Sequence, residues 1–120
     1  MIRSATQADI VRCFDERIAA YTGLKVTDLD PAKFVAVEQD GYMMCALIYT
    51  KDTDAEVHLI SPRESALKSR DLCREIINLL SATGIKTIYT TSTGKNRRAD
   101  NLAKRLGFTE IRNGVYALEV

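Results

Sequence analysis

Residues 55–60 read Ala-Glu-Val-His-Leu-Ile and residues 85–91 read Ile-Lys-Thr-Ile-Tyr-Thr-Thr, and both stretches predict strands. Apolar residues at helical spacing lie between them, so a helix from Ser65 or Ser69 to Ala82 connects the two strands. A strand–helix–strand connection of this length predicts a parallel neighbouring pair within a mixed sheet. Parallel strands that separate beyond their carboxyl ends leave a crevice beside helix N-termini, which favour anions. We therefore expect a ligand between these two strands.

The rest of the chain predicts further strands and helices around this unit. Asp40-Gly41 and Asn113-Gly114 are strong hairpin signals, and Gly23 and Gly107 are expected helix ends. Besides the unit above, the expected elements are a strand at 2–4, a helix from Thr6 to Gly23, strands at 34–37 and 42–50, a helix that ends at Gly107, and strands at 108–112 and 115–120. The predicted fold class is therefore α/β with a mixed sheet, in the order β-α-β-β-β-α-β-α-β-β, as one domain of residues 1–120.

The composition is that of an ordinary globular protein, with 46% apolar and 28% charged residues in a chain of 120, which allows a core of useful size. There is no apolar run long enough to span a membrane, and the N-terminus lacks the apolar stretch of a signal peptide. The three cysteines, Cys13, Cys45 and Cys73, are far apart and odd in number, which argues against a disulfide framework or a metal site. We expect buried free thiols and a cytoplasmic location.

The charge is unevenly divided along the chain. Residues 1–60 contain 6 Lys and Arg against 10 Asp and Glu, a net charge of −4, and residues 61–120 contain 11 against 6, a net charge of +5. A basic half suggests an anionic ligand, although a solvated surface explains it equally well. Nucleic acid is a less favoured partner, because the basic residues are interleaved with acidic ones and no aromatic stacking surface is evident.

Two motifs and the element order carry a resemblance to a known family. Residues 2–9 read IRSATQAD, and residues 96–108 read NRRADNLAKRLGF. The first resembles the "IRxAT..D" start of the GNAT (Gcn5-related N-acetyltransferase) superfamily. The second matches the family's "N..A...Y...GF" motif in spacing through Asn96, Ala99, Gly107 and Phe108. The resemblance covers the whole chain in element order, and it implies the GNAT fold and direct transfer of an acetyl group from acetyl-CoA to an amine of a small molecule or protein.

The resemblance also implies a binding site for acetyl-CoA. The backbone of residues 58–61 would pair with the pantetheine arm, and residues 63–70 would wrap the pyrophosphate at a helix start. Asn96 either caps the following helix or contacts pantetheine, and Lys95, Arg97 and Arg98 lie where the 3′-phosphate would be. The implied cofactor-binding residues are Leu59, Ile60, Ser61, Arg63, Ser65, Ala66, Leu67, Lys68, Ser69, Arg70, Asn96 and Ala99.

The candidate catalytic residues are Glu56, His58 and Tyr116. Glu56 and His58 are two apart on a strand that is expected to be central, so their side chains share one face. Titratable groups there are unusual unless they face a wet cleft or lie on a solvated part of the sheet. Glu56 is the first candidate for the general base, and His58 is the second. Tyr116 would donate a proton to the leaving thiolate, or it packs in the core with a hydroxyl partner.

Two departures from the family favour an alternative function. Residues 63–70 read RESALKSR, without the glycines of the family's phosphate loop, and Ala103 occupies the position of the tyrosine that protonates the thiolate in many members. The alternative is a non-catalytic GNAT-fold binding or regulatory protein, of the kind that bacteriophages also encode, which binds CoA or a protein partner without turnover. The sequence does not identify the acceptor amine, and it allows a homodimer that pairs through the last strand, if that strand lies at a sheet edge.

Overall fold

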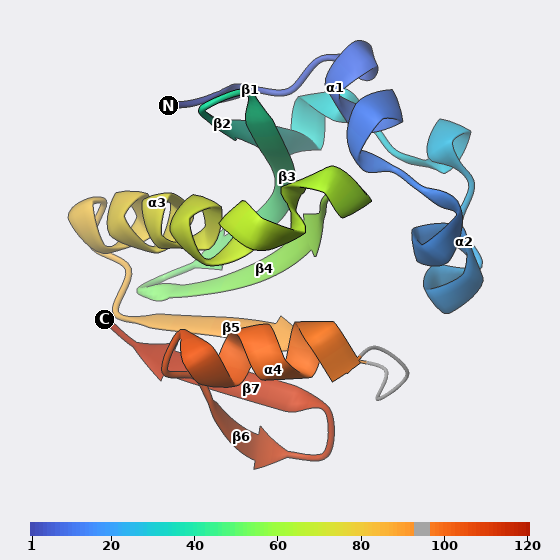
Figure 1. The fold of residues 1–120 in the computed structure, drawn as a ribbon. Helices are drawn as coiled ribbons and strands as arrows, with labels where there is room; N and C mark the ends of the chain where they lie inside the picture. Colours follow the sequence, from blue (N-terminus) through green and yellow to red (C-terminus); the bar gives the residue numbers. More distant parts are fainter. Residues whose placement is uncertain (93–96) are drawn as a thin grey trace.

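The computed structural model describes residues 1–92 and 97–120, which form a seven-stranded mixed sheet with helices on both faces (Figure 1). The strands are β1 (Ile2–Ser4), β2 (Phe34–Gln39), β3 (Tyr42–Lys51), β4 (Asp54–Ile60), β5 (Thr87–Thr91), β6 (Thr109–Arg112) and β7 (Val115–Glu119). The helices are α1 (Gln7–Cys13), α2 (Glu16–Thr22), α3 (Ser69–Ala82) and α4 (Arg97–Arg105), with short 3-10 helices η1 (Val26–Asp28), η2 (Pro31–Lys33) and η3 (Arg63–Lys68). The strand order in the sheet is β1-β2-β3-β4-β5-β7-β6, and β4 and β5 are the parallel pair, as predicted.

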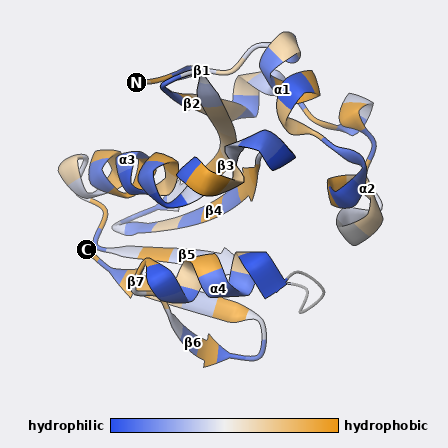
Figure 2. Ribbon diagram, in the orientation of Figure 1, coloured by the Kyte–Doolittle hydropathy of each residue, from blue (hydrophilic) through white to orange (hydrophobic). Residues whose placement is uncertain are grey.

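The sheet separates two hydrophobic clusters, because successive side chains of a strand point to opposite faces. On β3, Met43 and Cys45 are buried in the cluster that also holds Ile10 of α1. Met44 and Ala46 alternate with them and join the cluster formed with α3. Figure 2 shows hydrophobic and hydrophilic residues alternating along α3 and α4, as expected for helices with one buried face. Helices α1 and α2 thus accompany one face of the sheet, and α3 and α4 cover the other.

The predicted first helix, from Thr6 to Gly23, is wrong as a single element, because the structure contains two short helices there. Phe14 has an extended backbone, with φ −93 and ψ 102, and it ends α1. Asp15 then begins α2, since its carboxylate accepts hydrogen bonds from the backbone N–H groups of Arg17 and Ile18. The turn carries the chain away from the sheet after α1, and α2 ends at Gly23 in a left-handed conformation.

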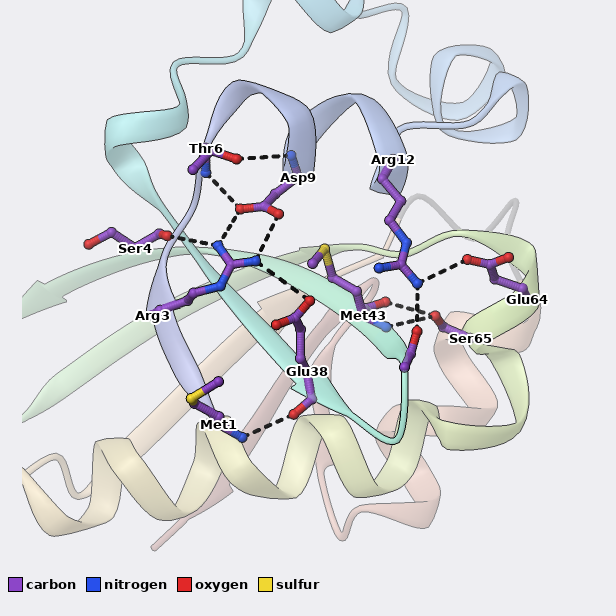
Figure 3. A network of polar contacts seen from close by, with 11 residues as sticks. Met1, Arg3, Ser4, Thr6, Asp9, Arg12, Glu38, Met43, Glu64 and Ser65 are labelled. Atoms are coloured by element: carbon purple, nitrogen blue, oxygen red, sulfur yellow. Dashed lines mark hydrogen bonds and ion pairs between the residues drawn. The ribbon is translucent and has the colours of Figure 1, made fainter.

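The start of α1 is tied to the first strand by polar contacts (Figure 3). Thr6 and Asp9 form a capping box, in which each side chain accepts a hydrogen bond from the other residue's backbone N–H. Nη2 of Arg3 donates to Asp9 Oδ1 at 2.9 Å. This guanidinium contact holds the pKa of the buried Asp9 carboxyl well below its usual range. Arg3 therefore fixes the N-terminus of α1 against β1.

The last strand, β7, lies inside the sheet, whereas a dimer that pairs through it would need it at an edge. Strand β7 pairs with β5 on one side and with β6 on the other. The expectation that the last strand is a free edge is therefore wrong. The edges of the sheet are β1 and β6.

Candidate functional site

The parallel strands β4 and β5 separate after a short ladder. Their pairing begins at Asp54 and Thr87 and ends at Glu56 and Tyr89. Beyond that point β4 stays with β3 as far as the rung that joins Cys45 and Ile60. Strand β5 stays instead with β7 up to Thr91. Figure 1 shows β4 curving away from β5 toward their carboxyl ends. The predicted gap between the two strands is confirmed.

A cleft of about 1090 Å³ passes through this opening. It is lined by the end of β4, by Phe14 at the end of α1, and by residues from α2, α3, β5 and α4, so it is reached from both faces of the sheet. The cofactor and catalytic candidates that line it are His58, Leu59, Ile60, Ser61, Ala66, Ser69, Ala99 and Tyr116. The candidates outside that lining are Glu56, Arg63, Ser65, Leu67, Lys68 and Arg70. Asn96 and Lys95 lie outside the described residues.

Glu56 and His58 share a face of β4 and contact each other. Nε2 of His58 lies 2.9 Å from Oε1 of Glu56. The two side chains are 37% and 48% exposed for His58 and Glu56, respectively, so both are accessible to solvent. His58 lies opposite Leu47, which packs with the cluster beneath α1. The pair therefore faces the α1 and α2 side of the sheet.

Tyr116 lies on the opposite face of the sheet from this pair. It pairs with Thr90 on β5, and Ile88, two residues away, belongs to the core beneath α3. The Tyr116 side chain is buried and hydrogen-bonds to Asp100 of α4. Burial, followed by the nearby Asp100 and Glu110 carboxylates, raises the pKa of its hydroxyl. Tyr116 and His58 therefore reach the cleft from different sides of the sheet.

The segment expected to wrap the pyrophosphate forms the 3-10 helix η3. Such a helix uses backbone N–H groups internally, and the N–H of Ser65 donates to the carbonyl of Pro62 at 3.0 Å. The fully buried Ser65 hydroxyl donates to the Met43 carbonyl at 2.8 Å and accepts from the Met43 N–H at 3.2 Å (Figure 3). The Ser65 side chain therefore connects η3 to β3 by two hydrogen bonds. Sequence reasoning missed this contact, because the partner is 22 residues away.

The charged residues near η3 and α4 differ in their surroundings. Nζ of Lys68 lies 3.4 Å from Asp40 Oδ2, whereas Arg63 and Arg70 are exposed and Leu67 is 93% exposed. From the other side, Arg97, Arg98 and Arg105 of α4 line the cleft. Sequence reasoning missed Arg105, although the spacing of Arg97, Asn101 and Arg105 marks one face of a helix.

The chemistry of the cleft does not include a cysteine nucleophile. Cys73 lines the cleft, but burial raises the pKa of its thiol to about 12, so the thiol stays protonated. Cys13 and Cys45 are free and buried, as is Cys73, which confirms the prediction for all three. In the part of the chain that the structure describes, no three potential metal ligands converge, and none of the helices has the length and apolar character needed to cross a bilayer.

Comparisons with known proteins place this geometry in context. A scan against protein-family models found no match, and neither did a search of curated proteins. Among solved structures, the chain is similar to the aminoglycoside acetyltransferase AAC(6′)-Ib in complex with coenzyme A, with a TM-score of 0.73, 13% identity and coverage of 99% of this chain and 94% of that one. It is similar to the ribosomal-protein-S18-alanine N-acetyltransferase from Escherichia coli (TM-score 0.68, 16% identity, coverage 100% and 93%). A GNAT-family acetyltransferase from Bacillus anthracis also matches (TM-score 0.69, 12% identity, coverage 98% and 93%). With its parted parallel strands and its cleft, the chain has the fold of the GNAT acetyltransferases.

Proposed function

We propose that this protein is an acetyl-CoA-dependent N-acetyltransferase and a divergent member of the GNAT superfamily. The observation that carries the proposal is the opening between β4 and β5, through which a cleft of about 1090 Å³ passes. The similarity to GNAT acetyltransferase structures, one of them solved with coenzyme A, supports it. The cleft is accessible from both faces of the sheet, so the cofactor would enter from the α3 and α4 side and the acceptor from the α1 and α2 side.

The residues present fit an acyl-CoA. The end of β4, from Val57 to Ile60, pairs with β3 alone, so it has an edge that the pantetheine amides would join. The start of α3, a helix of 14 residues, lies beside Lys68 and Arg70 and would hold the pyrophosphate. Arg97 and Arg98 line the cleft from α4 and would contact a further phosphate. Bound acetyl-CoA would supply the activated acetyl thioester.

A titration of protein stability with CoA and acetyl-CoA tests the proposal. A ligand at about 100 times its Kd stabilises the folded state by about 2.7 kcal/mol. We expect both compounds to raise the unfolding temperature and acetyl-CoA to release CoA when an amine is present. A suitable panel contains an aminoglycoside, a polyamine and a peptide with an N-terminal alanine. If neither CoA compound stabilises the protein, the transferase proposal and the CoA-binding alternative both fail.

A double variant tests the phosphate site. Lys68→Ala with Arg70→Ala removes two positive charges beside the start of α3 and should weaken CoA binding by about tenfold or more, since each charge-assisted hydrogen bond contributes about 1.5–3 kcal/mol before screening. Lys51→Ala with Lys86→Ala is the matched control, because these exposed lysines lie near the starts of β4 and β5, at the ends of the two strands that are far from the opening. Equal affinities in the two double variants would reject the phosphate assignment.

A second candidate function is CoA binding without turnover. Three observations favour it: η3 uses backbone N–H groups internally, Ala103 is buried at the position of the family's tyrosine, and Tyr116 lies on the face opposite Glu56 and His58. Stabilisation by CoA without acetyl transfer to any amine would support this candidate.

We further propose that residues 1–120 form one domain and that the protein is located in the cytoplasm. Its three cysteines are free and buried, which suits a reducing compartment. The acceptor would be a cationic amine, because residues 1–60, which include α1 and α2, have a net charge of −4, from 6 Lys and Arg against 10 Asp and Glu. A homodimer would use a free edge of the sheet, which β1 and β6 provide.

A further inference from the structure

The contact between Glu56 and His58 separates the roles of the two residues. Nε2 of His58 is 2.9 Å from Oε1 of Glu56. An ionised carboxylate accepts hydrogen bonds and does not donate them, so the ring nitrogen in this contact carries the proton. In the neutral ring the other nitrogen, Nδ1, then holds a lone pair. The contact therefore leaves His58 with an acceptor nitrogen that Glu56 does not occupy.

The two residues also lie at different distances from the opening. Glu56 pairs with Tyr89 at the last rung that β4 and β5 share. His58 is two residues further along β4, beyond the point of separation, and it lines the cleft, whereas Glu56 is outside that lining. A general base has to reach the reacting proton directly or through one water. His58 lies at the cleft, and Glu56 contacts the His58 ring.

We propose that His58 takes the proton of the acceptor amine at Nδ1, and that Glu56 is a positioning residue that acts through the His58 ring. The assignment rests on the proposed transferase function. The ammonium form of the acceptor gives one proton to Nδ1, which leaves a neutral amine and an imidazolium ring, and the ring then releases that proton to water. Glu56 keeps the proton of the neutral ring on Nε2, holds the ring in place and stabilises the imidazolium by a charge-assisted hydrogen bond.

The ring can be observed without an acceptor, because His58 is the one histidine of the chain. NMR of 15N-labelled protein should show a protonated Nε2 and a bare Nδ1 in the neutral ring. Diethyl pyrocarbonate, which acylates bare imidazole nitrogens, should modify His58 in the wild type. His58→Asn provides the blank. A protonated Nδ1 in the neutral ring, or a wild-type modification that does not exceed the blank, overturns the proposal.

A double-mutant cycle on acetyl transfer tests the order of the two residues. His58→Asn should lower kcat by about 100-fold or more. Glu56→Gln should lower it about tenfold, since a charge-assisted hydrogen bond becomes a neutral one. The double variant should fall no further than His58→Asn, because Glu56 acts through the ring, and KM for acetyl-CoA should stay unchanged. Asp54→Asn is the control, because it removes the same charge from the same face of β4 at the far end from the cleft.

The outcomes separate this proposal from the proposed function. A loss in Glu56→Gln that exceeds the loss in His58→Asn, or that adds to it, would make Glu56 the base and reject the order proposed here. Stabilisation by CoA together with a wild-type rate in His58→Asn would reject the His58 assignment while the transferase function stands. Failure of the transferase function is a different result, in which neither CoA nor acetyl-CoA stabilises the wild-type protein.

Discussion

Replacing Ser65 by alanine tests how the cleft is held open on the η3 side. The Ser65 hydroxyl is fully buried, and it satisfies both the N–H and the carbonyl of Met43. Met43 is two residues beyond the last rung that β3 shares with β4, which joins Cys45 and Ile60. Two further rungs would place Pro62, which has no N–H to donate, opposite Met43. Ser65 therefore takes the place of a strand at the end of β3.

The magnitude follows from the two groups that Ser65→Ala leaves unsatisfied. A buried donor or acceptor without a partner costs about 1–3 kcal/mol, so we expect the loss of both partners to lower the free energy of unfolding by about 2–6 kcal/mol. With a urea m-value of about 2 kcal/mol/M, the midpoint shifts downward by about 1–3 M, measured by circular dichroism. Ser81→Ala is the control, because this exposed α3 residue should change stability by about 0.5 kcal/mol or less. Equal midpoints in the two variants would refute the claim that the hydrogen bonds between Ser65 and Met43 stabilise the fold.

Three further predictions concern titration and backbone conformation. Because Arg3 lowers the pKa of Asp9, this pair stabilises the fold above pH about 4 and loses its effect as the pH falls further. In Asp9→Asn, the urea midpoint should therefore fall less steeply as the pH is lowered below about 4, and the same pH dependence as in the wild type would contradict the prediction. Because burial raises the pKa of Tyr116, one of the five tyrosines should ionise late at 295 nm, and Tyr116→Phe should remove that step and the loss of stability above pH about 10. Gly114→Ala should lower the free energy of unfolding by more than about 1 kcal/mol, because φ is +77 and the new Cβ would lie 2.6 Å from a backbone carbonyl oxygen. Gly41→Ala, with φ +83 and open space around the new Cβ, should show the smaller loss that the backbone strain causes without a steric clash.

Local signals predicted most of the fold. The helix start at Thr6, the hairpin turns and the strand–helix–strand unit depend on residues close in sequence, and the structure contains all of them. The break at Asp15 was missed because Ile10, Phe14 and Ile18 continue the helical spacing across it, although aspartate is a good N-cap. Local patterns carry no information on strand order, so the position of β7 between β5 and β6 became visible in the structure alone.

The candidate site was predictable where it depends on one strand and not where it depends on several. Glu56 and His58 share a face because side chains of a strand alternate, and this needs no knowledge of other strands. The face of Tyr116 depends on the register between β5 and β7, which places it with Thr90 and Ile88 on the other side. Under the proposed function, Tyr116 could therefore act in the same reaction as His58 only through the opening between β4 and β5.

The two halves of the chain differ in net charge, and each half supplies the helices of a different face of the sheet. Residues 1–60 end where β4 ends, and they include α1 and α2 on one face, whereas the basic residues 61–120 supply α3 and α4 on the other. The net charge of each half attracts ligands of the opposite sign. A cationic amine and an anionic thioester would therefore approach from opposite faces of the sheet, without competing for one surface. Under the proposed function, the point at which they meet is the opening beyond Glu56 and Tyr89, where His58 is the first titratable side chain of β4 to line the cleft.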